Sequence, residues 1–208
     1  MLNVGLTGGI ASGKSTVAQL LVEKGAFLVD ADALVHELEA PEVGVWEAIV
    51  THFGVEILKE DRTIDRRRLG AIVFTDARAR ETLNRLVHPA VQEERRRRIA
   101  AIAAVHPQAV ILSDVPLLFE TGMQGDFDLV LLVYVPLAVQ HERLAARDGF
   151  SREEAKARLA SQMPITSKVA LSDFVIRNDG DFSETERQVE AVWLELVKQE
   201  RGKGRIAS

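Results

Sequence analysis

A run of residues near the N-terminus has the composition of a phosphate-binding loop. The sequence Gly8-Gly9-Ile10-Ala11-Ser12-Gly13-Lys14-Ser15-Thr16 matches the pattern G-x-x-x-x-G-K-[ST]. Glycines let the backbone curl so that successive N–H groups converge on phosphate oxygens, while the lysine reaches the β- and γ-phosphates and the serine hydroxyl coordinates Mg²⁺. An apolar segment precedes the run and an amphipathic one follows it, which disfavours a glycine-rich turn without a ligand. The predicted nucleotide-binding residues are Gly8, Gly9, Ala11, Ser12, Gly13, Lys14, Ser15 and Thr16.

Acidic residues follow two other apolar segments. Asp30-Ala31-Asp32 comes directly after residues 26–29, and Asp114 comes just after residues 109–112. Ligands bind at the carboxyl ends of parallel strands, so one of the first two carboxylates can accept or orient the proton of an attacking hydroxyl. Asp114 can orient a magnesium ion. Plainer alternatives remain: Asp30 or Asp32 can cap the next helix, and Asp114 can form a turn before Pro116.

The elements that must position these residues alternate between strands and helices. Short apolar runs bounded by turn residues predict strands, and near-continuous hydrophobicity suits strands covered on both faces. Apolar residues at helical spacing predict helices between them. The expected strands are residues 2–6, 26–29, 109–112, 129–135 and 174–176, and the expected helices are 14–24, 137–147 and 183–199. We therefore expect an α/β fold of the P-loop type, with a parallel five-stranded sheet flanked by helices.

The region between residues 32 and 107 interrupts this alternation, because it is nearly all helix-like and too long for one crossover. We interpret it as a helical insertion that holds an acceptor substrate. A second helical excursion, rich in Arg and Lys, resembles a lid. The predicted organisation is a nucleotide-binding core of residues 1–31, 108–142 and 169–201, an acceptor-binding insertion of residues 32–107, a lid of residues 143–168, and a flexible tail of residues 202–208.

Composition excludes several classes of protein. The chain carries 26 basic and 31 acidic residues, a net charge of −5, which disfavours nucleic acid as the main partner. It has no cysteine, so disulfides and thiolate metal sites are excluded. No apolar run approaches the roughly 20 residues needed to span a membrane, and the first residues lack the pattern of a signal peptide. We expect a cytoplasmic enzyme that acts on small molecules.

The phosphate loop alone fits kinases, GTPase switches and motor ATPases. GTPases read guanine with Asn-Lys-x-Asp and sense the γ-phosphate with Asp-x-x-Gly, and neither motif occurs at the matching place. The short chain, the helical insertion and the basic lid favour phosphoryl transfer to a small acceptor. Another hydroxyl acceptor, such as a nucleoside or a shikimate-like alcohol, and an ATP-gated binding protein remain as alternatives.

Segments along nearly the whole chain resemble the dephospho-coenzyme A kinase family. In chain order they are Leu6-Thr7-Gly8-Gly9-Ile10, Val29-Asp30-Ala31-Asp32, Thr63-Ile64-Asp65-Arg66, His88-Pro89, Asp114-Val115-Pro116-Leu117-Leu118-Phe119-Glu120, Gln140-His141-Glu142-Arg143-Leu144 with Arg147-Asp148, and Gln162, Asp173 and Val175-Ile176-Arg177-Asn178. The phosphate loop is shared widely, whereas the Pro-Leu-Leu-Phe-Glu run and the lid motif are far more specific. Two departures stand out: Ala11 replaces a frequent third loop glycine, and Arg62 replaces a glycine common before the Thr-Ile-Asp run.

The resemblance implies transfer of the ATP γ-phosphate to the 3′-hydroxyl of dephospho-coenzyme A, with Mg²⁺ as cofactor. It implies that Asp32 is the base or orienter of that hydroxyl. Arginine suits the lid because its planar fork pairs with phosphate oxygens. The expected residues are, for catalysis, Asp32, Lys14, Arg143 and Arg147; for the nucleotide, the loop together with Asn178; for the acceptor, Asp32, His88 and Leu117; and for the metal, Ser15 and Asp114.

Several charged residues also have an ordinary structural explanation. The run Arg95–Arg98 follows Glu93 and Glu94, which can pair with Arg97 and Arg98 one helical turn later, so a solvated helix face is expected there. A surface ion pair is the corresponding alternative for either lid arginine. His88, before Pro89, is as often buried or capping as functional, and only the resemblance favours an acceptor role.

Overall fold

The chain divides into two compact units. The computed structural model describes residues 1–148 and 151–204, and the side chains at positions 147, 148, 152 and 204 fall outside the described set. One unit, the sheet unit, comprises Met1–Val29 and Ala101–Ser208, and the other, the helical unit, comprises Asp30–Ala100. No helix among the described residues is both long enough and apolar enough to cross a bilayer.

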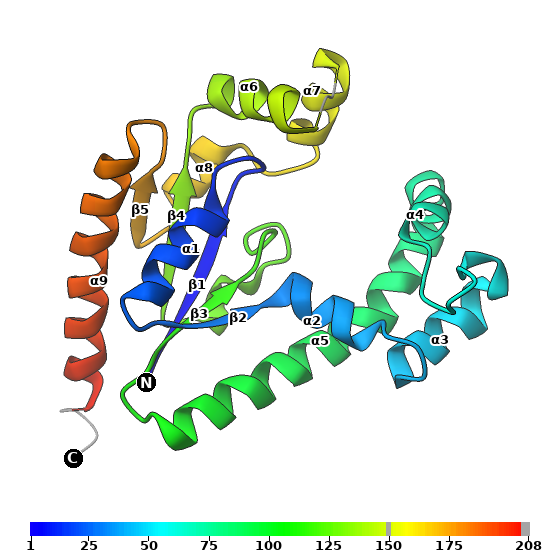
Figure 1. The fold of residues 1–208 in the computed structure, drawn as a ribbon, viewed down its shortest axis with the longest axis horizontal. Coiled ribbons are helices and arrows are strands. Elements are labelled where there is room, and N and C mark those ends of the chain that lie inside the picture. Colours follow the sequence, from blue (N-terminus) through cyan, green and yellow to red (C-terminus); the bar gives the residue numbers. More distant parts are fainter. Residues whose placement is uncertain (149–150, 205–208) are drawn as a thin grey trace. The chain divides into compact units, whose positions relative to one another are not determined.

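The centre of the sheet unit is a five-stranded sheet in the order β2-β3-β1-β4-β5 (Figure 1). Its strands are β1 (Leu2–Gly8), β2 (Phe27–Asp30), β3 (Val110–Asp114), β4 (Leu129–Tyr134) and β5 (Phe174–Arg177). Every strand pair whose register is described runs parallel. All the predicted strands are therefore confirmed, with ends that differ by one or two residues. Because β1 is central, the loop that follows it opens at the middle of the sheet edge.

The sheet unit also contains helices α1 (Lys14–Glu23), α6 (Leu137–Asp148), α7 (Arg152–Ala160), α8 (Ile165–Val169) and α9 (Phe182–Gly204), with a short 3₁₀ turn, η2 (Met123–Asp126). Of these helices, α1, α8 and α9 contact the strands. Helices α1 and α9 contact each other, and α9 also contacts β5 (Figure 1). Their buried residues Leu21, Val189 and Leu196 join the apolar side chains of the strands in one core. Helix α9 continues to Gly204, so residues 202–204 of the predicted tail are helical; residues 205–208 lie outside the described set.

The helical unit contains α2 (Ala31–Leu38), α3 (Gly44–Phe53), the 3₁₀ turn η1 (Val55–Ile57), α4 (Arg66–Thr75) and most of α5 (Ala77–Val105). Helix α5 continues through Pro89 without ending. Proline removes one backbone hydrogen bond, and the surrounding turns of a long helix compensate for that loss. The helical character expected for residues 32–107 is confirmed.

Trp46 belongs to the core of the helical unit. It is buried, and its indole Nε1–H donates to the Arg62 backbone oxygen at 2.9 Å. The Arg62 guanidinium lies 5.2 Å from the centre of the Trp46 ring. Arg62 itself has a φ of 65°, in the left-handed region that favours glycine. The common family glycine at this position therefore has a conformational reason, and the contacts of Arg62 offset the strain in this chain.

Candidate active site

The phosphate loop follows β1 and turns twice through the left-handed region. Ala11 has a φ of 58° and Gly13 a φ of 81°. The Ser12 N–H donates to the Gly9 oxygen at 3.0 Å, which closes the first turn. Helix α1 then begins at Lys14 with no side-chain cap, so its first N–H groups keep the orientation that binds an anion. Ala11 thus occupies a glycine-type conformation, as Arg62 does.

Side chains from distant elements hold the second half of the loop. The Asn178 side-chain amide, just beyond β5, donates to the Ser12 oxygen at 2.8 Å. Its Oδ1 accepts a hydrogen bond from the buried Thr185 hydroxyl at 3.0 Å. Arg143 donates to the Asn178 backbone oxygen at 2.7 Å and, at 3.4 Å, to the oxygens of Ala11 and Ser12. The loop is therefore braced by neutral amides and by one cation.

Two glutamines hold the first half of the loop at Ile10. Gln140, buried in α6, donates to the Ile10 oxygen at 3.0 Å. Gln162, between α7 and α8, accepts from the Ile10 N–H at 3.0 Å. A side chain at Gly9 would collide with the Gln140 carboxamide, so any larger residue there would displace the Gln140 side chain from Ile10. The sequence places both glutamines in family-like segments but gives no sign of these contacts.

An ion pair connects the loop to the end of β3. The Lys14 ammonium pairs with Asp114 Oδ1, and both side chains are largely buried. Asp114 therefore sits beside the loop, as predicted for a carboxylate that helps to orient magnesium. Ser15, the first hydroxyl of α1, is exposed, whereas Ser12 Oγ is buried without a hydrogen-bond partner.

The two predicted lid arginines differ in what the structure describes. The Arg143 guanidinium contacts backbone carbonyl oxygens of the loop and of Asn178. The alternative of a surface ion pair with Asp148 lies outside the described side chains. The Arg147 side chain lies outside the described residues.

An ion pair forms where β5 ends. Arg177, the last residue of β5, donates a hydrogen bond to Asp179 in the following loop, which lowers the pKa of Asp179 and raises the pKa of Arg177.

Within the helical unit, the two aspartates of the Asp-Ala-Asp motif have different environments. Asp30 is the N-cap of α2, and its Oδ1 accepts from the N–H groups of Asp32 at 2.8 Å and Ala33 at 3.1 Å. The capping alternative is therefore correct for Asp30. Asp32 lies in the first turn of α2 with an exposed side chain, so its carboxylate is accessible to a ligand.

The expected acceptor residues occupy exposed positions in separate parts of the chain. His88 is exposed on α5 of the helical unit. Leu117 lies in the turn after β3 in the sheet unit, with 42% of its surface exposed. An exposed leucine beside a polar site offers apolar surface to a ligand. The acceptor role of both residues stays a prediction.

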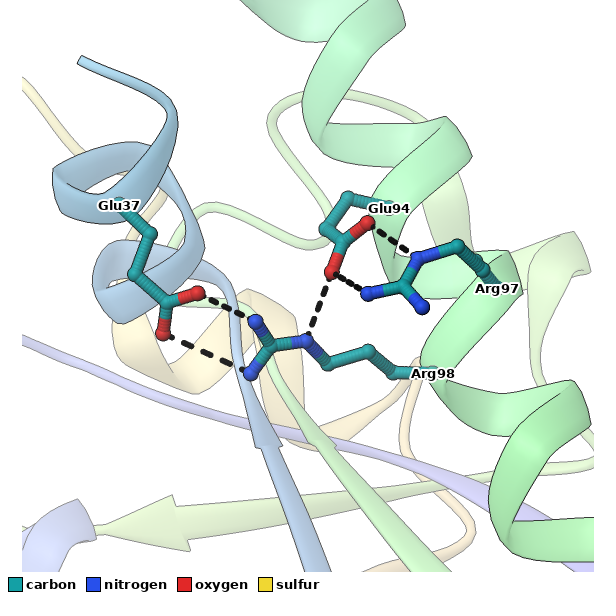
Figure 2. A network of polar contacts seen from close by, with 4 residues as sticks. All are labelled: Glu37, Glu94, Arg97 and Arg98. Atoms are coloured by element: carbon teal, nitrogen blue, oxygen red, sulfur yellow. Dashed lines mark hydrogen bonds and ion pairs between the residues drawn. The ribbon is translucent and has the colours of Figure 1, made fainter. Parts of the chain in front are cut away.

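In the basic run Arg95–Arg98, the last two arginines form ion pairs with glutamates (Figure 2). Glu94 accepts hydrogen bonds from both Arg97 and Arg98, and Arg98 also pairs with Glu37 of α2. The structural explanation is thus confirmed for Arg97 and Arg98. One prediction was inaccurate: Arg95 is buried rather than solvated, and it donates to Gln92 at 2.8 Å.

Together, the fold and the loop define the class of protein. A parallel sheet with a complete phosphate loop after its central strand, a lysine paired with a carboxylate at the end of the neighbouring strand, and a separate helical unit are the parts of a P-loop phosphotransferase.

Comparisons with known proteins identify the family. The family model "Dephospho-CoA kinase" matches residues 2–184. A dephospho-CoA kinase from Syntrophus aciditrophicus is 50% identical over 201 residues, which is 97% of this chain and 86% of the relative. A solved dephospho-CoA kinase from Campylobacter jejuni has a TM-score of 0.72 at 28% identity, covering 95% of this chain and 98% of that one. A solved Thermus thermophilus protein has a TM-score of 0.77 at 35% identity, covering 94% and 97%. The chain belongs to the dephospho-CoA kinase family, as its motifs predict.

Proposed function

We propose that this chain transfers the γ-phosphoryl group of ATP to the 3′-hydroxyl of dephospho-coenzyme A, the final step of coenzyme A synthesis. The observation that carries the proposal is the braced phosphate loop with its Lys14–Asp114 pair, in a chain that matches the family over nearly its whole length. The hydroxyl oxygen attacks the γ-phosphorus, the bond to the β-phosphate oxygen breaks, and ADP leaves. The hydroxyl proton goes to a carboxylate.

Asp32 is the proposed acceptor or orienter of that proton. Of the two motif aspartates, Asp30 already uses its carboxylate as a helix cap, whereas the Asp32 side chain is exposed and its backbone N–H is held by Asp30. The cap therefore orients the first turn of α2, and Asp32 with it. The phosphoryl transition state is loose, so positioning the hydroxyl matters at least as much as basicity.

Lys14 and the loop N–H groups would hold the phosphates. The lysine charge approaches the β- and γ-phosphates in such loops, and its pairing with Asp114 keeps it at the loop before ATP arrives. Arg143 is bound to loop carbonyls, which supports a role in shaping the nucleotide site. Asn178 holds the same loop, and His88 and Leu117 remain the proposed acceptor contacts.

The residues present fit a magnesium ion bound together with ATP. Among the described residues there is no cluster of three or more His, Cys, Asp or Glu side chains that could hold a metal. Magnesium is usually bound through one or two protein oxygens together with substrate phosphates, and it keeps several waters. The exposed Ser15 hydroxyl and the Asp114 carboxylate supply such oxygens. When bound, the ion would neutralise charge that develops on the phosphates.

Product analysis with a panel of acceptors tests the proposal. The pure protein is incubated with Mg·ATP and dephospho-coenzyme A, adenosine, shikimate or no acceptor, and product masses are recorded. We expect rapid ADP formation and the mass of one added phosphate only with dephospho-coenzyme A. Equal background with every acceptor would refute the assigned substrate, and fast hydrolysis without any acceptor would point instead to an ATP-driven switch.

The Asp32→Asn variant tests the assigned base. Asparagine keeps the size of the side chain but cannot take the proton, so we expect the transfer rate to fall about 10²- to 10⁴-fold, the usual contribution of general acid–base catalysis. ATP affinity, measured by calorimetry, should stay unchanged. The matched control is Asp30→Asn, because asparagine also caps helices well and this variant should keep most of its activity. Wild-type turnover by Asp32→Asn would remove Asp32 from the mechanism.

A further inference from the structure

A short segment of the sheet unit lies directly on the phosphate loop. We call residues 162–168 the strap; it begins after α7 and includes most of α8. At its first residue, Gln162 Oε1 accepts from the Ile10 N–H at 3.0 Å. Further along, the buried Ile165 side chain approaches Gly9 so closely that its Cδ1 would lie 3.3 Å from an added Cβ there. The strap therefore covers the first half of the loop by both polar and apolar contact.

The other end of the strap is fixed by a buried ion pair. The Lys168 side chain is fully buried, and its Nζ lies 2.8 Å from Glu120 Oε1. The same Glu120 oxygen accepts from the Met163 N–H at 2.9 Å. Helix α8, which contains Lys168, contacts β4. A buried ammonium is tolerated only beside a charged or strongly polar partner, and Glu120 supplies that charge, although Lys168 Nζ makes no hydrogen bond of good geometry among the described residues. We call the Glu120–Lys168 pair the anchor.

The position of Glu120 makes the anchor relevant to the site. Glu120 ends the segment Asp114–Glu120 that starts at the partner of Lys14. One carboxylate thus holds the strap through Met163 and Lys168, and the strap holds Ile10 through Gln162.

We propose that Gln162 is a positioning residue that preorganises the phosphate loop, and that the Glu120–Lys168 pair keeps Gln162 in place. Gln162 and Gln140 together occupy both polar groups of the Ile10 backbone. Rotation of the peptide bonds around Ile10 would break one of these bonds, so the adjacent left-handed turn at Ala11 is held in its ligand-binding form. The role assigned to Gln162 rests on one part of the proposed function, the binding of ATP by the loop, and not on the identity of the acceptor.

The Gln162→Met variant tests the first link. Methionine keeps the length of the side chain but cannot accept the Ile10 N–H. A loop that is competent only part of the time shows a weaker apparent affinity. We expect the Kd for Mg·ATP to rise about 3- to 10-fold, the range produced by losing one neutral hydrogen bond. Amide hydrogen exchange in peptides covering residues 8–13 should accelerate. The matched control is Gln108→Met, the same change at an exposed glutamine elsewhere in the sheet unit, which should alter neither quantity.

These readouts separate positioning from a purely structural role. If Gln162 only stabilises the fold, Gln162→Met lowers the Tm but leaves the Kd for Mg·ATP and the loop exchange rates unchanged well below the Tm, and the proposal is wrong. Both quantities can be measured without an acceptor. If the wild-type protein bound ATP but did not phosphorylate dephospho-coenzyme A, the proposed function would be refuted. The role of Gln162 would still be decided by the Kd for Mg·ATP and the loop exchange rates.

A pair of anchor variants tests the second link. Lys168→Met alone leaves the buried Glu120 carboxylate without its cation and displaces the strap, so we expect ATP affinity to fall, but no further than in Gln162→Met. Adding Glu120→Gln removes the uncompensated charge and keeps an oxygen for the Met163 N–H, so the double variant should recover most of the affinity. In Gln162→Met, adding Lys168→Met should weaken ATP binding little further, because both act through one contact. Fully additive losses would show that Lys168 does not act through Gln162.

Discussion

The phosphate loop of the sheet unit and the Arg–Glu cluster of the helical unit use polar side chains in opposite ways. Around the loop, buried side chains form neutral hydrogen bonds: Gln140, with 2% exposure, holds the Ile10 backbone oxygen, and Thr185, with none, holds the Asn178 side chain. In the cluster, exposed arginines such as Arg97, with 67% exposure, pair with glutamates (Figure 2). The two arrangements differ in solvent access. Water screens the second far more than the first, so large effects are expected only at the loop.

Between these two regions, the largest expected effect is that of Lys14→Met. The variant removes the charge proposed to face the phosphates, and removing one group that stabilises developing charge typically lowers kcat by about 10²- to 10³-fold. The measurement is the rate of phosphorylated product at saturating ATP. Lys24→Met provides the matched control, because Lys24 ends the same helix and pairs with Glu190 at the surface. If Lys14→Met and Lys24→Met lost activity to the same extent, the position of Lys14 in the loop would not explain its effect.

A smaller effect is expected where the loop is braced indirectly. Thr185→Val is nearly isosteric, but it removes the hydroxyl that donates to Asn178 Oδ1 in a fully buried place. Losing one buried hydrogen bond and leaving its acceptor unpaired destabilises a protein by about 1 to 3 kcal/mol. The free energy of unfolding in urea measures this change.

Thr75→Val is the counterpart in the helical unit. The Thr75 hydroxyl donates to the Ala71 oxygen on an exposed helix surface. Surface changes of this kind usually stay within about 0.5 kcal/mol. If Thr75→Val proved as destabilising as Thr185→Val, solvent access would not be the feature that separates the two regions.

The sequence predicted the parts of the site that depend on local pattern. The loop at residues 8–16, the strand before it and the carboxylate at Asp114 all follow from short-range spacing and from apolar runs. The partners of the loop do not. Gln140 and Gln162 are 130 and 152 residues away from Ile10, and nothing in their own neighbourhood indicates a backbone contact. Such contacts depend on how the helices pack in three dimensions, and that packing cannot be read from the sequence alone.

Family resemblance supplied one signal that local reasoning missed. Both positions where this chain lacks a glycine usual in the family, Ala11 and Arg62, have positive φ angles of 58° and 65°. The missing glycines therefore mark the turns, although the local residue pattern predicted no strain there. The opposite situation occurs in two helices. Helix α5 continues through Pro89 and helix α9 continues to Gly204, although proline and glycine both disfavour a helix, because the surrounding residues stabilise the helical conformation.

The smallest expected effect concerns the pH dependence of the Arg–Glu cluster. Hydrogen bonds from Arg97 and then Arg98 lower the pKa of Glu94 from 4.5 to about 2. A carboxylate whose folded-state pKa is depressed stabilises the fold above its unfolded-state pKa, and that contribution disappears as the pH falls from about 4.5 towards 2. Because the cluster is solvent-exposed, we expect the contribution to be below about 1 kcal/mol. The measurement is the difference in unfolding free energy between wild type and Glu94→Gln at pH 6 and at pH 3. The difference should shrink at the lower pH and in high salt; a difference that is large and insensitive to salt would place Glu94 with the buried groups around the loop instead.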